Sequence, residues 1–188
     1  AGLGSYATKI SLLPSPGGGA AVLSVYVVAL LVMVMGGRAA ATAAVGSLRT
    51  RGHYVMIQPR PGLEAAIVFG MLALLILDGL SMPWAAGLVA LAVGVILLLK
   101  MKDWRFSQVL HDPEVWPLHL GFLWLAIGMA LIGLERLALI SPPDTGALHA
   151  LAAGGIGTVT LVMMLRVTRQ RAGDLPASVA YLQALQLI

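Results

Sequence analysis

Long apolar runs, separated by short polar segments, dominate the chain. Five stretches are apolar and long enough for a helix to cross a bilayer, which takes about 20 residues. They cover residues 18–36, 62–80, 83–100, 116–138 and 145–166. A partial sixth covers residues 176–188. The runs are too long for strands and show no alternation with a period of two. The pattern predicts an all-α fold, a polytopic transmembrane helix bundle of five full spans plus a partial sixth.

Small and polar residues mark the expected ends of these spans. Gly36 and Gly37 are predicted to end the first helix, and Ser81 to make a tight turn before the third. The segment Ser141-Pro142-Pro143-Asp144 breaks the chain before the fifth span, with Asp144 or Thr145 as the helix N-cap. We expect residues 1–188 to form a single transmembrane domain that belongs to a longer chain.

The composition excludes a water-soluble protein. Of the 188 residues, 59% are hydrophobic and 11% charged, whereas soluble domains are about one-quarter charged. The absence of cysteine excludes disulfides, thiolate metal sites and cysteine catalysis. The sequence contains no phosphate-binding loop, no HExxH motif and no pattern of a hydrolase triad. Any metal ligands must therefore be His, Met, carboxylate or backbone groups.

The basic residues fall mostly on one side of the predicted bundle. Ten of the twelve lie in the segments after spans one, three and five: Arg38, Arg49, Arg51, Arg60, Lys100, Lys102, Arg105, Arg166, Arg169 and Arg171. Only Lys9 and Arg136 fall on the other side. Cytoplasmic loops are enriched in Lys and Arg, so this side is expected to face the cytoplasm. The pattern indicates a multi-pass protein of a bacterial inner membrane, with its N-terminal end outside, and does not indicate nucleic-acid binding.

Two of the four histidines lie inside predicted spans. His53 and His111 are in loops, where most histidines are merely solvated, whereas His119 and His149 are within spans. An ionisable group in hydrocarbon is costly, so it is a candidate functional residue. From the rise of a helix, the two imidazoles are about 20 Å apart along the membrane normal. They cannot bind one metal ion or one haem together, so two sites are expected if both are ligands.

Small residues surround the second of these histidines. At helical spacing they form two neighbouring stripes: Gly146, Ala150, Gly154 and Thr158, and His149, Ala153 and Gly157. Such faces let helix backbones approach closely. They also leave room for a flat macrocycle beside a ligating imidazole. The spacing leaves both interpretations open.

Two methionines lie in the same span at the depth of His119. Met163 and Met164 would form, with that imidazole, a workable ligand set for haem or copper(I). Most methionines in membrane helices only fill space, and this alternative stays open.

Two segments resemble the NnrS family of bacterial membrane proteins. They are "WPLHLGFLWLAIGMALIGL" and "ALHALAAGGIGTVTLVMMLRVT". The matching positions are His119, His149, Gly154, Gly157, Thr158, Met164 and Arg166, and "GGR" at Gly36, Gly37 and Arg38 resembles the family's GR motif. The match covers about residues 20–175.

The resemblance implies a membrane protein that binds haem and copper and is linked to nitric oxide and denitrification. It implies His119 and His149 as ligands, with Arg38 and Arg166 placed to pair with a propionate or a carboxylate. It also implies partners: the lipid bilayer, haem, nitric oxide, and a missing N-terminal half or another membrane subunit.

The sequence departs from the family pattern at two points. "AAATAAV" follows the GR motif, and Arg171 stands where the family often has a histidine. Because Arg171 replaces that histidine, one ligand expected for a metal site near the cytoplasmic side is missing.

Two other functions stay open. One is half of a solute transporter or permease, although spans two to five show no clear internal repeat. The other is a structural membrane subunit without a cofactor.

Overall fold

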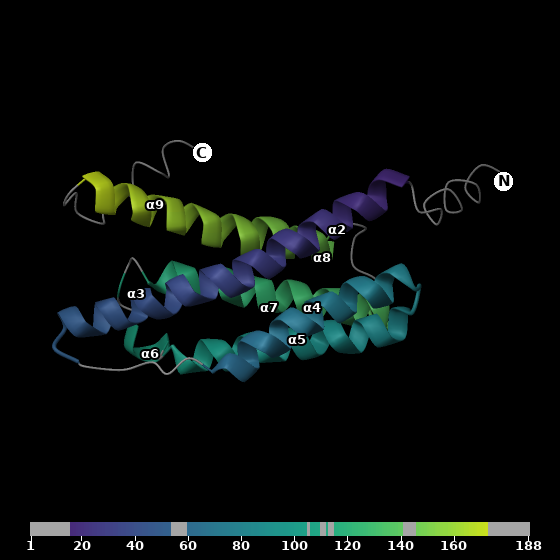
Figure 1. Ribbon diagram of the computed structural model, residues 1–188, viewed down its shortest axis with the longest axis horizontal. Helices are drawn as coiled ribbons and strands as arrows, with labels where there is room; N and C mark the ends of the chain where they lie inside the picture. Colours follow the sequence, from purple (N-terminus) through teal and green to yellow (C-terminus); the bar gives the residue numbers. More distant parts are fainter. Residues whose placement is uncertain are drawn as a thin grey trace.

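The computed structural model describes residues 16–53, 60–104, 106–109, 112, 115–140 and 146–172. This part of the chain is helical and contains no strand (Figure 1). Five of its helices are long and apolar enough to cross a membrane: Val22–Arg49, Pro61–Gly79, Pro83–Asp103, Trp116–Arg136 and Gly146–Thr168. The predicted all-α transmembrane bundle with five spans is therefore confirmed. The predicted partial sixth span, residues 176–188, lies outside the described residues.

The first span continues well beyond its predicted end. The α-helix α2 (Pro16–Leu31) runs through the π-helical segment η1 (Val32–Gly36) directly into α3 (Gly37–Thr50). The prediction that Gly36 and Gly37 end this helix is wrong, because both keep helical backbone angles, with φ of −61° and −62°. They are needed for close packing instead. A Cβ atom on Gly37 would lie 2.6 Å from the Nζ of Lys100.

The second, third and fourth spans match their predicted positions. They are α4 (Pro61–Gly79), α5 (Pro83–Asp103) and α7 (Trp116–Arg136), each with proline in its first turn, where the missing N–H costs nothing. Between α4 and α5 the chain turns at Ser81, which takes a positive φ of 56°. The short helix α6 (Phe106–Val109) follows α5.

The fifth span is not a uniform α-helix. It consists of α8 (Gly146–His149), the eight-residue π-helical segment η2 (Ala150–Gly157) and α9 (Thr158–Ala172). A π-helix is wider than an α-helix and is rare, and it occurs often at functional sites. The predicted N-cap residues of this span, Asp144 and Thr145, lie outside the described residues.

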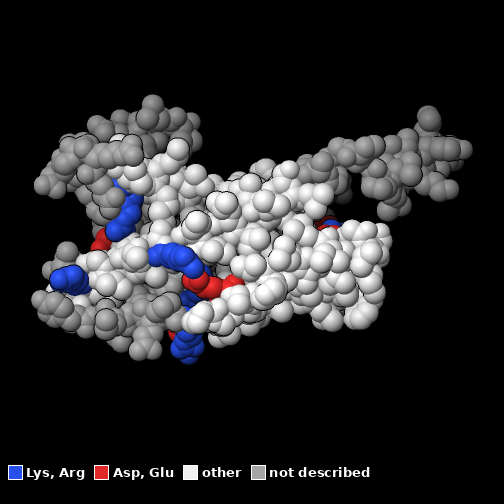
Figure 2. Space-filling view, in the orientation of Figure 1, with Lys and Arg blue, Asp and Glu red and all other residues white. Residues whose placement is uncertain are grey.

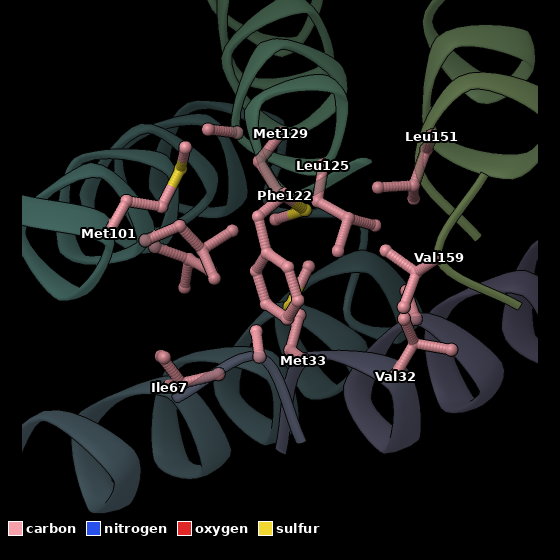
Figure 3. Packing of buried hydrophobic residues seen from close by; sticks show 14 of the residues in the cluster. Val32, Met33, Ile67, Met101, Phe122, Leu125, Met129, Leu151 and Val159 are labelled. Atoms are coloured by element: carbon pink, nitrogen blue, oxygen red, sulfur yellow. The ribbon is translucent and has the colours of Figure 1, made fainter. Parts of the chain in front are cut away.

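Helix α7 is the centre of the bundle. In its membrane-spanning window 61% of the residues are buried, the largest share of the five spans. Figure 3 shows Phe122, Leu125 and Met129 of α7 pointing into the core. Side chains from the surrounding helices meet them there: Val32, Met33, Ile67, Met101, Leu151 and Val159.

Glycines allow the neighbours of α7 to approach its backbone. A Cβ atom on Gly87 of α5 would lie 2.9 Å from the carbonyl oxygen of Gly133 on α7, and the reverse distance is also 2.9 Å. On another face, a Cβ atom on Gly128 would lie 2.9 Å from the Cα atom of Leu151 in η2. The backbones of α5 and η2 therefore lie directly against α7, as is common for membrane helices with small residues at their contacts.

Charged side chains gather at one end of the bundle. Figure 2 shows blue and red atoms over α3 and the neighbouring ends of α4, α5 and α9, while the middle of the visible face is uncharged. We call this end, which contains Arg38, Arg60 and Lys100, the basic end. At the opposite end, Arg136 of α7 pairs with Asp78 of α4. The uncharged region between the two ends fits the hydrocarbon layer of a bilayer.

We expect Gly128→Ala to lower the stability of the bundle by about 1–3 kcal/mol, because backbone atoms of η2 occupy the position of the new methyl group. Thermal unfolding of the protein in detergent measures this effect. The matched control is Gly46→Ala in α3, where nothing lies within 4 Å of the added Cβ. That change should leave stability unaltered or raise it slightly, since alanine favours a helix over glycine. Equal loss in both variants would refute close backbone packing at Gly128.

Candidate functional site

His119 is fully buried in the first turn of α7. Its imidazole is 0% exposed, and its ring Nδ1 lies 3.1 Å from the backbone carbonyl oxygen of Val115. Since a carbonyl only accepts hydrogen bonds, Nδ1 carries the proton, and the lone pair is on Nε2. Trp104, at the end of α5, packs edge-on against the imidazole with ring centres 5.6 Å apart. The packing and the hydrogen bond together fix the orientation of the ring.

His149 is at the opposite end of the bundle. It is the last residue of α8, and its side chain is exposed. The residues just before it, Ala147 and Leu148, line a cavity of about 70 Å³ together with Tyr26 and Arg136. His119, in contrast, lies beside the C-terminal end of α5, near the basic end. The structure therefore does not bring the two imidazoles together.

The small residues of the fifth span have two different environments. One predicted stripe, which includes Gly154, is half-buried, and a Cβ atom there would lie 2.9 Å from the indole ring of Trp124. This stripe serves helix packing. The other stripe, His149, Ala153 and Gly157, is exposed along its whole length. The imidazole of His149 thus lies at one end of an exposed helix face made of small residues.

The two methionines of α9 differ in exposure. Met163 packs against the hydrophobic core, whereas Met164 is 66% exposed. The pairing of the His119 imidazole with a thioether of this helix stays a prediction. Further along α9, the Nη1 of Arg166 is buried and has no hydrogen-bond partner among the described residues.

A polar cavity of about 470 Å³ opens at the basic end. Arg38 pairs with Glu64 at 3.1 Å, and Arg60 pairs with Asp103 at 3.1 Å. Lys100 completes the cluster; its residue is only 7% exposed. From the sequence, Arg38 was the candidate binding residue here, whereas Arg60 and Lys100 were interpreted as topology signals. One signal was available: Glu64 and Lys100 lie at the ends of neighbouring antiparallel spans, on the same side of the membrane.

The ammonium group of Lys100 reaches into the bundle between two helices. Its Nζ donates a hydrogen bond to the carbonyl oxygen of Met33, at 3.5 Å, within the π-helical segment η1. It also lies 3.7 Å from a carboxylate oxygen of Glu64. Both contacts are long for a buried cation. The lysine passes directly over Gly37, which explains why this position of the continuous helix has no side chain.

A second polar cluster joins three helices at the opposite end. The carboxylate of Asp78 on α4 accepts hydrogen bonds from the guanidinium of Arg136 on α7, at 3.0 Å, and from the hydroxyl of Tyr26 on α2, at 3.3 Å. In the sequence, Asp78 and Arg136 lie near the ends of two different predicted spans, and nothing local indicates a contact between them. The structure pairs them instead, so they connect the helices.

The described residues contain no cluster of three or more His, Cys, Asp or Glu side chains that could hold a metal ion. A metal bound here would need ligands of other kinds, or from other segments. His119 nevertheless has the hydrogen bond expected of a ligating imidazole, because ligating histidines usually donate their other ring N–H to a carbonyl or carboxylate. Within the described residues, His119 and His149 can each offer one imidazole nitrogen, and no three-ligand group of these residue types is assembled around either of them.

We expect Asp78→Asn to destabilise the protein by about 1–2 kcal/mol, because Arg136 loses its charged partner while Tyr26 keeps a weaker acceptor. The melting temperature in detergent is the measurement. Glu135→Gln is the control, since this exposed carboxylate lies at the same end and has no ion pair among the described residues. A similar loss in the control would show that net charge, and not this contact, sets the stability.

Comparison with protein families gives one match. The model of the family described as NnrS protein matches residues 2–188, nearly the whole chain. Neither the curated proteins nor the solved structures give a match. The match extends the resemblance seen around His119 and His149 to the remaining helices. The chain belongs to the NnrS family of membrane proteins.

Proposed function

We propose that this protein binds haem in the membrane and acts in the response to nitric oxide or nitrosative stress. Membership of the NnrS family supports a membrane protein linked to that response. Haem as the cofactor, copper as a second one and the identity of the ligands are our proposal. A haem iron, when bound, supplies the coordination position that nitric oxide takes.

The observation that carries this proposal is the hydrogen bond between Nδ1 of His119 and the carbonyl of Val115. It fixes the tautomer in which Nε2 has the lone pair that an iron or copper ion requires. Trp104 packs against the ring and restricts its rotation. Metal ligation is a function that fits an imidazole held in this tautomer and orientation.

His149 is proposed as the ligand of a separate site. Its imidazole is exposed, and the smooth face formed with Ala153 and Gly157 gives a planar group room to lie against the helix. A second ligand for this site must come from outside the described residues, such as another segment of a longer chain or a membrane subunit.

Arg166 and Arg38 are proposed as partners for anionic groups such as propionates. The Nη1 of Arg166 has no hydrogen-bond partner among the described residues, so a charged acceptor would satisfy it. Arg38 is already paired with Glu64 at 3.1 Å, which makes it the weaker candidate. For copper we propose Met163 and Met164 as thioether ligands, because both lie in the fifth span at the depth of His119 and thioethers suit copper(I).

We expect the purified protein to show a Soret absorption band that shifts when nitric oxide is added. His119→Leu keeps the volume of the side chain but removes the ligating nitrogen, and should abolish or strongly weaken the band of its site. His149→Ala should do the same for a second site. His53→Ala is the control, because this exposed histidine lies in a loop, and should leave the spectrum unchanged.

The outcomes separate the competing functions. Unchanged spectra in both the His119 and His149 variants would remove these residues as ligands. A protein with no Soret band and no copper by elemental analysis would instead favour a structural subunit or part of a permease. If only one variant changes the spectrum, the protein holds haem at that end alone.

We also propose that the basic end faces the cytoplasm of a bacterial cell and that the opposite end faces outward, as the positive-inside rule indicates. The chain lacks cysteine, so single cysteines can be introduced without background labelling. We expect an impermeant maleimide to label Ser81→Cys on intact spheroplasts and to label His53→Cys only after lysis; both positions are exposed. The reverse pattern would show the opposite orientation.

A further inference from the structure

The cavity at the basic end has the chemistry of an anion site. Its walls hold three cations, Arg38, Arg60 and Lys100, and two carboxylates, Glu64 and Asp103, so its charge is one positive unit in excess. The volume of about 470 Å³ is within the range of about 300–1,000 Å³ that is usual for pockets binding small ligands.

The two arginines keep most of their donors available. Each makes one ion pair with a described residue, at 3.1 Å, and their side chains are 66% and 65% exposed. A guanidinium has five N–H groups in a rigid fork that matches the geometry of phosphate oxygens. Arg38 and Arg60 come from α3 and from the residue preceding α4, so they approach the cavity from different elements.

Lys100 supplies the buried charge of the cavity. Among the described residues its ammonium group has two polar contacts, both long, at 3.5 Å and 3.7 Å, although the residue is 7% exposed. An ammonium has three donors, and an anion in the cavity would meet it at a shorter distance. The three cations thus present donors to one space, while each carboxylate is already neutralised by an arginine.

The position of the cavity at the end of the membrane spans indicates which class of anion it binds. Arg60 directly precedes α4, and Asp103 is the last residue of α5, so the cavity lies where these spans leave the hydrocarbon layer. Basic pockets between transmembrane helices at this level accept the phosphate of anionic lipid headgroups. Leu63 and Trp104 add apolar walls, which suit the glycerol and upper acyl carbons of a lipid.

We propose that this cavity binds a phosphate group, supplied either by an anionic phospholipid headgroup or by free inorganic phosphate. Arg38 and Arg60 hold its oxygens, and Lys100 neutralises it from the buried side. This site uses neither of the two histidines, but it shares Arg38 with the groups proposed to pair with a propionate, so the test substitutes Arg60, which has no proposed role in haem binding.

The test measures phosphate and lipid binding to the full chain. Calorimetric titration with inorganic phosphate in detergent measures the free anion, and native mass spectrometry of protein released from phosphatidylglycerol nanodiscs, with phosphatidylcholine nanodiscs for comparison, measures the lipid. We expect Arg60→Gln to weaken binding about tenfold, as is usual for loss of a charge-assisted hydrogen bond. Arg60→Lys should give an intermediate loss, because it keeps the charge without the fork.

Arg49→Gln is the matched control, since Arg49 is an exposed arginine of α3 that does not line the cavity. Retention of phosphatidylglycerol without binding of free phosphate assigns a lipid site, and binding of free phosphate alone assigns a soluble ligand. Absence of both, or equal weakening by Arg49→Gln and Arg60→Gln, would overturn the proposal. The absorption spectrum should be the same in all these variants.

Discussion

Close contact between helix backbones along α7 (Trp116–Arg136) is the constraint on which the rest of the structure depends. In a bilayer the hydrophobic effect does not draw apolar helices together, because lipid tails are as apolar as their side chains. Association must come from dispersion contacts and polar contacts between helices. The glycine contacts of α7 with α5, through Gly87 and Gly133, and with η2, through Gly128, bring the backbones close enough for extensive dispersion contacts.

Polar contacts then fix the two ends of this bundle. At one end Asp78 joins α4 to α2 and α7 through Tyr26 and Arg136. At the basic end Lys100 and Glu64 connect α5 and α4, and the hydrogen bond of Lys100 to Met33 adds the long first helix. Each cluster lies at the end of the uncharged region, where the cost of burying charge is lower than at the bilayer centre. The ends thus set the relative positions of helices whose apolar faces alone would pack in several ways.

The two proposed binding sites, at His119 and at the cavity of the basic end, lie in different parts of the helix bundle. The orientation of the His119 ring depends on two helices. Val115, at the start of α7, accepts the hydrogen bond of Nδ1, and Trp104, at the end of α5, packs against the ring. The phosphate site depends on the ends of α3, α4 and α5. Trp104 contributes to both, as a wall of the cavity and as the neighbour of the imidazole.

The sequence by itself determined the number, type and approximate limits of the spans, because about 20 consecutive apolar residues have few other structures available. It also identified the two membrane histidines and the family, since these depend on residue type and local spacing. It could not locate the end of the first helix, because Gly36 and Gly37 permit a helix as well as a break, and only the packing against Lys100 and Phe122 decides between them. Likewise, the partners of Asp78, Lys100 and Glu64 lie on other helices, and the sequence pattern did not predict the π-helical course of residues 150–157. Pairings between distant segments were therefore decided by the tertiary structure, because no local pattern records which faces of separate helices meet.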